Sequence, residues 1–188
     1  MMKADIAEAI AEFTHSAESA IAAGFDGVEL HGANGYLIEQ FLCAKSNQRT
    51  DEYGGSVDNR LRFALEVARS VAAAIGADKV GIRVSPYGVF NDTGPDEHTD
   101  AVYTRLAEEL GKLGLAYIHV VDHSAMGAPP VKPEIKAAIR KAFGGPIILS
   151  GGYDLARANA DLAEGKGELV AFGRPFLANP EIGRASCR

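Results

Sequence analysis

The chain has 188 residues and carries 25 acidic and 19 basic side chains, which gives a net charge of −6 at pH 7. That balance argues against a nucleic-acid surface and against a basic membrane-binding face, so neither partner is predicted. The 47% share of hydrophobic residues is typical of globular proteins, and no apolar run approaches the ~20 residues of a membrane helix. Because the first residues lack the apolar core of a signal peptide, we expect a cytoplasmic protein.

A pattern of amphipathic helix, glycine and short apolar strand recurs along the chain. Apolar residues spaced by three or four predict helices over 6–21, 61–75, 103–113, 135–139 and 155–162. Apolar runs after the glycines predict strands at 28–30, 80–84, 117–121, 146–149 and 169–172. Alternation of this kind is typical of a parallel sheet, either an open doubly wound sheet or a (β/α)8 barrel.

Three features of length and pattern stand out. The segment 31–55 is too long for an ordinary strand-to-helix loop, which indicates a functional segment. The predicted strands number five, whereas a complete barrel has eight strands in ~250 residues. No helix is predicted after the last strand, and the unpatterned residues 183–188 look like a cloning scar or a truncation product.

The first predicted strand is followed by His31, Asn34 and Tyr36. Two side chains that can donate hydrogen bonds and one weakly acidic hydroxyl suit a site that polarises a carbonyl group. The same residues also fit a structural turn in which Asn34 and Gly35 adopt positive φ angles. Both interpretations remain open from this segment alone.

Arg83 stands inside an apolar strand. A buried guanidinium is costly unless it is paired, so Arg83 needs either an anionic ligand or an ion pair with Glu29 or Asp122. His119 and His123 flank the end of the third predicted strand, where a spacing of four residues does not bring metal ligands together. No metal site is therefore predicted.

Glycines follow the last two predicted strands, Gly151 and Gly152 after the fourth and Gly173 after the fifth, where Arg174 is next to it. Glycine allows backbone N–H groups to approach a phosphate closely, and arginine adds a cation. Two cysteines are too few for a disulfide framework, and Cys43 is expected to be a small buried residue.

Four segments together resemble the old yellow enzyme family of FMN-dependent ene-reductases, and the likeness extends over residues 13–180. They are 24–42, 46–56, 82–86 and 171–175. The family fold is a (β/α)8 barrel with FMN at the carboxyl ends of the strands. The resemblance implies that this α/β chain is a partial TIM barrel that holds the equivalents of strands 4 to 8, without strands 1 to 3 or the eighth helix. We therefore predict an incomplete barrel domain at 1–182 and an unstructured tail at 183–188.

The resemblance also implies roles for individual residues. His31 and Asn34 would bind the oxygen of an activated alkene, and Tyr36 would donate a proton to the alkene carbon. Arg83 would lie beside the pyrimidine edge of the flavin. The residues that match the phosphate-binding loops are Gly151, Gly152, Gly173 and Arg174. NADH or NADPH would reduce the flavin in a separate half-reaction.

The predicted function is reduction of the C=C bond of α,β-unsaturated carbonyl or nitro compounds. A barrel fragment that binds FMN or phosphate, or that only folds and oligomerises, is the alternative. An unrelated phosphate-binding barrel enzyme, such as an isomerase, is a third. Because a five-stranded parallel sheet exposes two edges, we also predict a homo-oligomer or a rearranged sheet.

Overall fold

A single parallel sheet with helices between its strands forms the chain in the computed structural model, which describes residues 1–179. The tail predicted at 183–188 lies outside these residues. The strands are β1 Val28–Gly32, β2 Val80–Val84, β3 Tyr117–Val121, β4 Ile147–Ser150 and β5 Leu169–Ala171. The α-helices are α1 Lys3–Ala22, α2 Leu37–Leu42, α3 Val57–Ile75, α4 Thr99–Leu113, α5 Pro133–Phe143, α6 Leu155–Ala163 and α7 Arg174–Ala178. Short 3-10 helices cover Ala77–Lys79, Phe90–Asp92 and Ser124–Met126.

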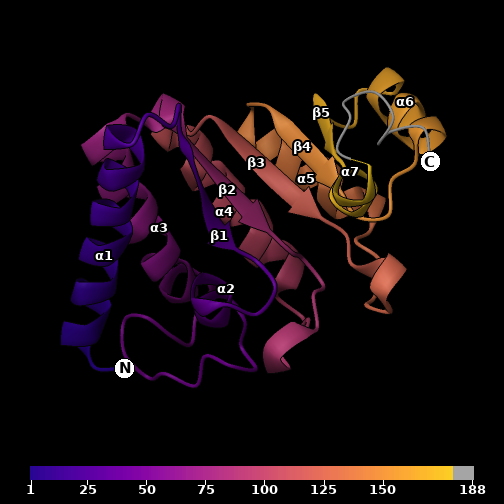
Figure 1. The fold of residues 1–188 in the computed structure, drawn as a ribbon. Helices are drawn as coiled ribbons and strands as arrows, with labels where there is room; N and C mark the ends of the chain where they lie inside the picture. Colours follow the sequence, from indigo (N-terminus) through magenta and orange to yellow (C-terminus); the bar gives the residue numbers. More distant parts are fainter. Residues whose placement is uncertain (180–188) are drawn as a thin grey trace.

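The order of the strands decides between the two architectures that the sequence left open. The sheet runs β1-β2-β3-β4-β5, every neighbouring pair is parallel, and the strands follow the order of the chain (Figure 1). A doubly wound sheet needs a point where the strand order reverses, and the described sheet has none. The sheet is therefore built like part of a barrel wall, and it is not rearranged.

Three local features differ from the predictions. β1 extends through Gly32, so His31 lies within the strand instead of after it. The segment 31–55, expected as one long loop, contains α2. No helix was predicted after β5, but a short helix, α7, is present there. Pro175 is compatible with it because a proline in the first turn of a helix removes an N–H group that has no partner within the helix.

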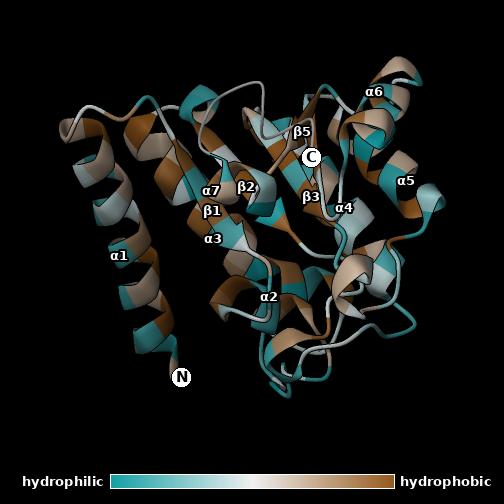
Figure 2. Cartoon of the chain, turned by 45° about the vertical axis from the view of Figure 1, so that its right-hand side comes forward, coloured by the Kyte–Doolittle hydropathy of each residue, from teal (hydrophilic) through white to brown (hydrophobic). Residues whose placement is uncertain are grey.

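The two faces of the sheet differ in chemistry. One face is packed against the helices through apolar residues, and α3, α4 and α5 contact one another in sequence along it. Its buried strand residues are Leu30, Val80, Ile82, Val84, Ile118, Val120, Ile147 and Leu149. Figure 2 shows hydrophobic brown along the strands, whereas α1 at the outside alternates between brown and teal. Within residues 1–179, no helix combines the length and the apolar character needed to cross a bilayer.

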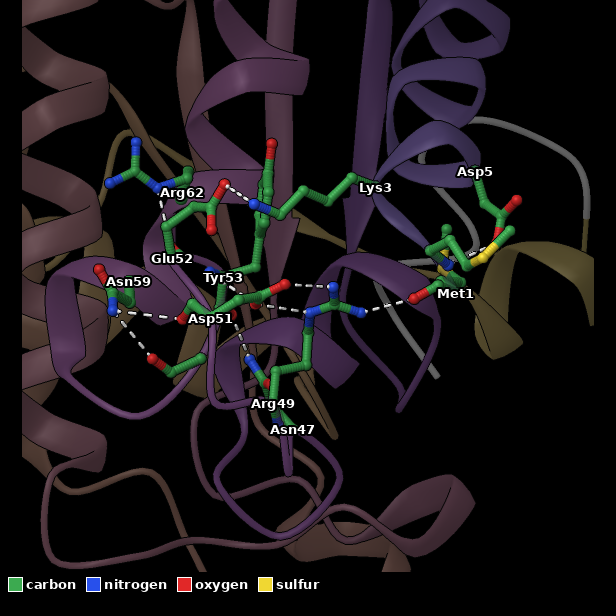
Figure 3. A network of polar contacts seen from close by, with 12 residues as sticks. Met1, Lys3, Asp5, Asn47, Arg49, Asp51, Glu52, Tyr53, Asn59 and Arg62 are labelled. Atoms are coloured by element: carbon green, nitrogen blue, oxygen red, sulfur yellow. Dashed lines mark hydrogen bonds and ion pairs between the residues drawn. The ribbon is translucent and has the colours of Figure 1, made fainter.

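Polar residues anchor the segment between α2 and α3 to its surroundings (Figure 3). Arg49 donates two hydrogen bonds to the carboxylate of Asp51, at 3.0 and 2.6 Å, and a third to the carbonyl oxygen of Met1 at 2.7 Å. The side-chain amide of Asn47 donates to the carbonyl oxygens of Phe41 and Tyr53, both at 2.7 Å. This segment is one of the four that carry the family resemblance, and its polar groups are used to hold the chain itself.

Candidate functional site

All residues predicted to bind the cofactor line one hollow at the carboxyl ends of the strands. They are Arg83, Gly151, Gly152, Gly173 and Arg174, contributed by three of the five strand ends. Other walls of the hollow include His119, His123, Ser150, Tyr153 and Phe172. The fold brings residues together here that are up to 91 positions apart in the chain, because parallel strands all end at the same edge.

Arg83 has no ion-pair partner among the described residues. Glu29 contacts His119 instead, at 2.9 Å, and Asp122 contacts Lys136 at 2.8 Å, so the expected alternative of a buried ion pair with either carboxylate is wrong. The Nε atom of Arg83 is buried and has no hydrogen-bond partner in the described part of the chain. Such a group is costly unless a ligand satisfies it, which favours an anionic or hydrogen-bond-accepting ligand in the hollow.

The glycines at the end of β4 adopt a backbone that other residues rarely take. Gly151 and Gly152 have φ angles of 111° and 64°. A Cβ atom on Gly151 would lie 1.9 Å from the carbonyl oxygen of Asp122, so no side chain fits there. Across the hollow, Arg174 is exposed and forms no ion pair with any described residue. Close backbone approach beside an unpaired cation is suited to a phosphate group.

His31, Asn34 and Tyr36 lie beside this hollow but do not line it. In the register of the sheet His31 is aligned with Arg83, and its ring lies 5.3 Å from the ring of Tyr36. Burial and the positive charge of Arg83 lower the pKa of His31, so its imidazole is neutral at pH 7 and has one N–H group that can donate to a ligand. Within residues 1–179 the ring nitrogens of His31 and the hydroxyl of Tyr36 have no hydrogen-bond partner.

Asn34 is held on several sides. Its φ angle is 60° and that of Gly35 is 71°, so the turn that the sequence suggested is present. The backbone N–H of Asn34 donates to Ser85 Oγ at 2.9 Å. Its carbonyl oxygen accepts from Asn91 Nδ2 at 2.8 Å, and its side-chain Oδ1 lies 2.7 Å from His123 Nε2. The structural turn and the candidate functional residues, which the sequence offered as alternatives, therefore occupy the same segment.

Glu39 supports this turn and was missed in the sequence analysis. It is only 2% exposed, and its carboxylate accepts from the N–H of Gly35 at 2.5 Å, from Ser85 Oγ at 2.6 Å and from Tyr103 Oη at 2.8 Å. Burial raises the pKa of Glu39, and these hydrogen bonds oppose that shift. The available signal was an acidic residue within the apolar run 37–42.

The two histidines near β3 serve different partners. His119 Nδ1 lies 2.9 Å from Glu29 Oε2, and its Nε2 lies 2.8 Å from Ser150 Oγ, whereas His123 contacts Asn34. Burial alone would raise the pKa of Glu29, but the hydrogen bond from His119 and the charge of His119 hold it below its usual value.

Cys43 was expected to be a small buried residue, and no metal site was predicted. Across residues 1–179 there is no group of three His, Cys, Asp or Glu side chains that could hold a metal ion. Cys43 is half-buried rather than buried, and its Sγ donates to the carbonyl oxygen of Gly94 at 3.3 Å. The half-exposed position arises because α2 ends at Leu42, so Cys43 lies just outside the packed helix.

Comparison with known proteins identifies relatives along almost the entire chain. The model of the NADH:flavin oxidoreductase / NADH oxidase family matches residues 1–185. 12-Oxophytodienoate reductase 2 of Arabidopsis thaliana is 44% identical over 91% of this chain and 46% of its own length. Aldehyde reductase FrzD of Cladobotryum sp is 44% identical over 95% of this chain and 49% of its own. The chain thus spans about half the length of the curated relatives it matches.

Solved structures agree with the fold. Morphinone reductase is 40% identical and superposes with a TM-score of 0.92, over 97% of this chain and 49% of its own. An old yellow enzyme homologue from Zymomonas mobilis is 34% identical with a TM-score of 0.91, over 98% and 52%. The likeness confirms the predicted partial barrel and the resemblance to old yellow enzymes. The chain belongs to the NADH:flavin oxidoreductase / NADH oxidase family.

Proposed function

We propose that this chain carries the FMN-phosphate and substrate-activating part of an oxidoreductase that reduces the activated C=C bond of α,β-unsaturated carbonyl or nitro compounds. The observation that carries the proposal is the set of unpaired groups at the carboxyl ends of the strands. Among residues 1–179, polar groups of Arg83, Arg174, His31 and Tyr36 have no hydrogen-bond or ion-pair partner there, while the polar residues around them are bonded to one another.

The residues that line the hollow fit FMN. Gly151, Gly152, Gly173 and Arg174 would hold its phosphate, and the buried Nε of Arg83 would donate to the pyrimidine edge of the ring. When bound, FMN supplies the hydride that NADH or NADPH provides. A matched structure of morphinone reductase contains tetrahydroNAD, which supports a nicotinamide as the reductant.

The second group of residues acts on the substrate. Addition of hydride to the β-carbon of the alkene places negative charge on the substrate oxygen. His31 and the Nδ2 of Asn34 donate hydrogen bonds to that oxygen, which stabilises the charge. Tyr36 then gives its hydroxyl proton to the α-carbon, which completes the saturated product. Its ring is beside that of His31 and its side chain is 56% exposed, so solvent can return the proton.

Two measurements on the purified protein test this proposal. FMN is titrated into the chain while flavin fluorescence is followed, and NADPH oxidation is then measured with and without 2-cyclohexenone. Binding at micromolar FMN and oxidation that depends on the enone are expected. A protein that neither binds FMN nor turns over the enone would refute the proposal.

A second candidate follows from the length of the relatives. Because the chain spans about half of each curated relative, the fragment alternative is FMN or phosphate binding without turnover. The same titration separates the two candidates. Quenching of flavin fluorescence without enone-dependent NADPH oxidation identifies the binding fragment.

We also propose that the chain self-associates through its exposed sheet edges. Among the described strands β5 pairs with β4 alone, and Leu169 on β5 is 57% exposed. Nearby, Phe176 and Leu177 of α7 are 46% and 85% exposed. Unpaired strand edges and exposed apolar side chains favour association. Sedimentation at micromolar concentration should show a dimer or larger species, and a well-folded monomer would contradict it.

A further inference from the structure

Asn34 offers only one polar side-chain atom to a ligand. Its backbone N–H and carbonyl oxygen are bonded to Ser85 and Asn91, and its Oδ1 contacts His123 Nε2 at 2.7 Å. The Nδ2 group has no hydrogen-bond partner in the described part of the chain. The direction of the amide therefore decides whether the site presents a donor or an acceptor.

The chemistry of the contact fixes the proton on His123. An amide oxygen can only accept a hydrogen bond, so the Nε2 atom of His123 must carry the hydrogen. Burial and the positive charge of Arg83 lower the pKa of His123, although the charge of Asp122 opposes this. The ring is therefore neutral at pH 7 and has one N–H group to place.

The position of His123 is itself constrained. Its side chain is 7% exposed, and its ring packs edge-on against Phe90 at a centroid distance of 4.7 Å. His123 also lines the hollow that holds Arg83, which places it between the two groups of proposed functional residues. A buried ring with one fixed N–H is a rigid support for a neighbouring amide.

We propose that His123 is a positioning residue that holds the Asn34 amide with its Nδ2 donor turned toward the substrate oxygen. The inference rests on the proposed function and deepens it, because it assigns the specificity of the site for a hydrogen-bond-accepting oxygen to a residue on a different strand end. Without His123 the amide can rotate by a half-turn. Its Oδ1 would then face the substrate oxygen, and two acceptors repel each other.

The first test does not depend on activity or on FMN. The ring nitrogens of His123 are observed by NMR in uniformly 15N-labelled protein near pH 7, where protonated and unprotonated ring nitrogens resonate far apart. The wild-type chain should show hydrogen on Nε2. In Asn34→Leu the acceptor is lost, and the chemical shifts of Nε2 and its hydrogen should change because that hydrogen bond is absent. An Nδ1–H ring in the wild type, or unchanged Nε2–H chemical shifts in Asn34→Leu, would overturn the proposal.

The second test measures the consequence for substrate. In FMN-loaded protein, His123→Phe should lower kcat/KM for 2-cyclohexenone about tenfold, the effect of one hydrogen bond, with kcat decreasing because the lost donor stabilises charge that develops during hydride addition. His123→Gln should restore most of the loss because its amide can donate to Asn34. His98→Phe is the matched control, since the exposed His98 lies at the start of α4.

The two arms separate failure of this inference from failure of the proposed function. If the wild type does not turn over the enone, the proposed function fails, and the NMR result still decides whether His123 positions Asn34. If kcat/KM is unchanged in His123→Phe while the wild type is active, the positioning role in catalysis is wrong.

Discussion

The segment between α2 and α3 and the carboxyl ends of the strands are both rich in polar residues, but they use them differently. In the segment, the charged and amide side chains of Asn47, Arg49 and Asp51 are bonded to the chain itself. At the strand ends, the Nε of Arg83 and the ring nitrogens of His31 have no hydrogen-bond partner within residues 1–179, although the His31 ring contacts that of Tyr36.

This difference indicates which family motifs stabilise the fold and which have polar groups left for a ligand. Both regions belong to the segments that carry the family resemblance, so motif strength alone does not separate them. A buried polar group that the protein leaves unpaired costs stability, and it is retained where a ligand satisfies it. Pairing therefore separates Arg49 and Asp51, which hold the segment, from Arg83, whose Nε has no hydrogen-bond partner among the described residues.

The largest expected effect is on the rate of the alkene half-reaction. Tyr36→Phe removes the hydroxyl proton and should slow the alkene half-reaction by about 10²–10⁴-fold, the range for a general acid. Flavin reduction by NADPH should remain near its normal rate. Stopped-flow measurement of each half-reaction checks this, and an equal decrease in both would disprove the role of Tyr36 as the proton donor.

A large stability effect is expected on the structural side. Arg60 in α3 is 1% exposed and contacts Asp96 at 2.7 Å. Asp96→Ala leaves the guanidinium buried without its anion and should lower the free energy of unfolding by about 3 kcal/mol, since Asp96 itself is partly exposed. Urea unfolding measures the change. Lys45→Ala is the control, because Lys45 pairs with Asp92 at the surface and should change stability by less than ~0.5 kcal/mol.

Arg174 tests whether the unpaired cation serves a ligand. Arg174→Ala should weaken FMN binding by about 1–3 kcal/mol, the range for charge-assisted hydrogen bonds, with little change in stability. Fluorescence titration gives the dissociation constant. Arg140→Ala removes the same charge from an arginine that pairs with Glu168 just before β5, and it should leave FMN binding unchanged. Equal affinities in all three proteins would exclude Arg174 from the phosphate site.

The smallest effect concerns the loop in Figure 3 at low pH. The hydrogen bond from Arg49 lowers the pKa of Asp51 from 3.8 to about 2. A carboxyl group whose pKa is lower in the folded protein stabilises the fold at pH values above its pKa in the unfolded chain. This stabilisation is lost as the pH falls from 3.8 to about 2. Urea unfolding between pH 2 and 5 should therefore show a shallower pH dependence in Asp51→Asn. Identical slopes would mean that the ion pair does not contribute.

The predictions from the sequence succeeded where the pattern was local. Helix stripes and apolar runs located the strands to within a few residues, because periodicity reflects which side chains each element buries. α7 and α2 were missed because five- and six-residue helices carry too little periodicity. The sequence predicted His31 after the first strand, whereas it lies inside β1. The error arose because a polar residue inside a strand looks like the end of the apolar run.

The sequence by itself determined the parallel α/β class, because helices and apolar strands alternate along it. Its four motif segments gave the resemblance to the family, and that resemblance supplied the residues proposed to bind FMN and substrate. Only the tertiary structure decided that Arg83 is unpaired, that Glu39 supports the turn and that His123 contacts Asn34. These contacts join residues from different strand ends or from a buried helix. No local pattern encodes them, because their partners meet only when the sheet assembles.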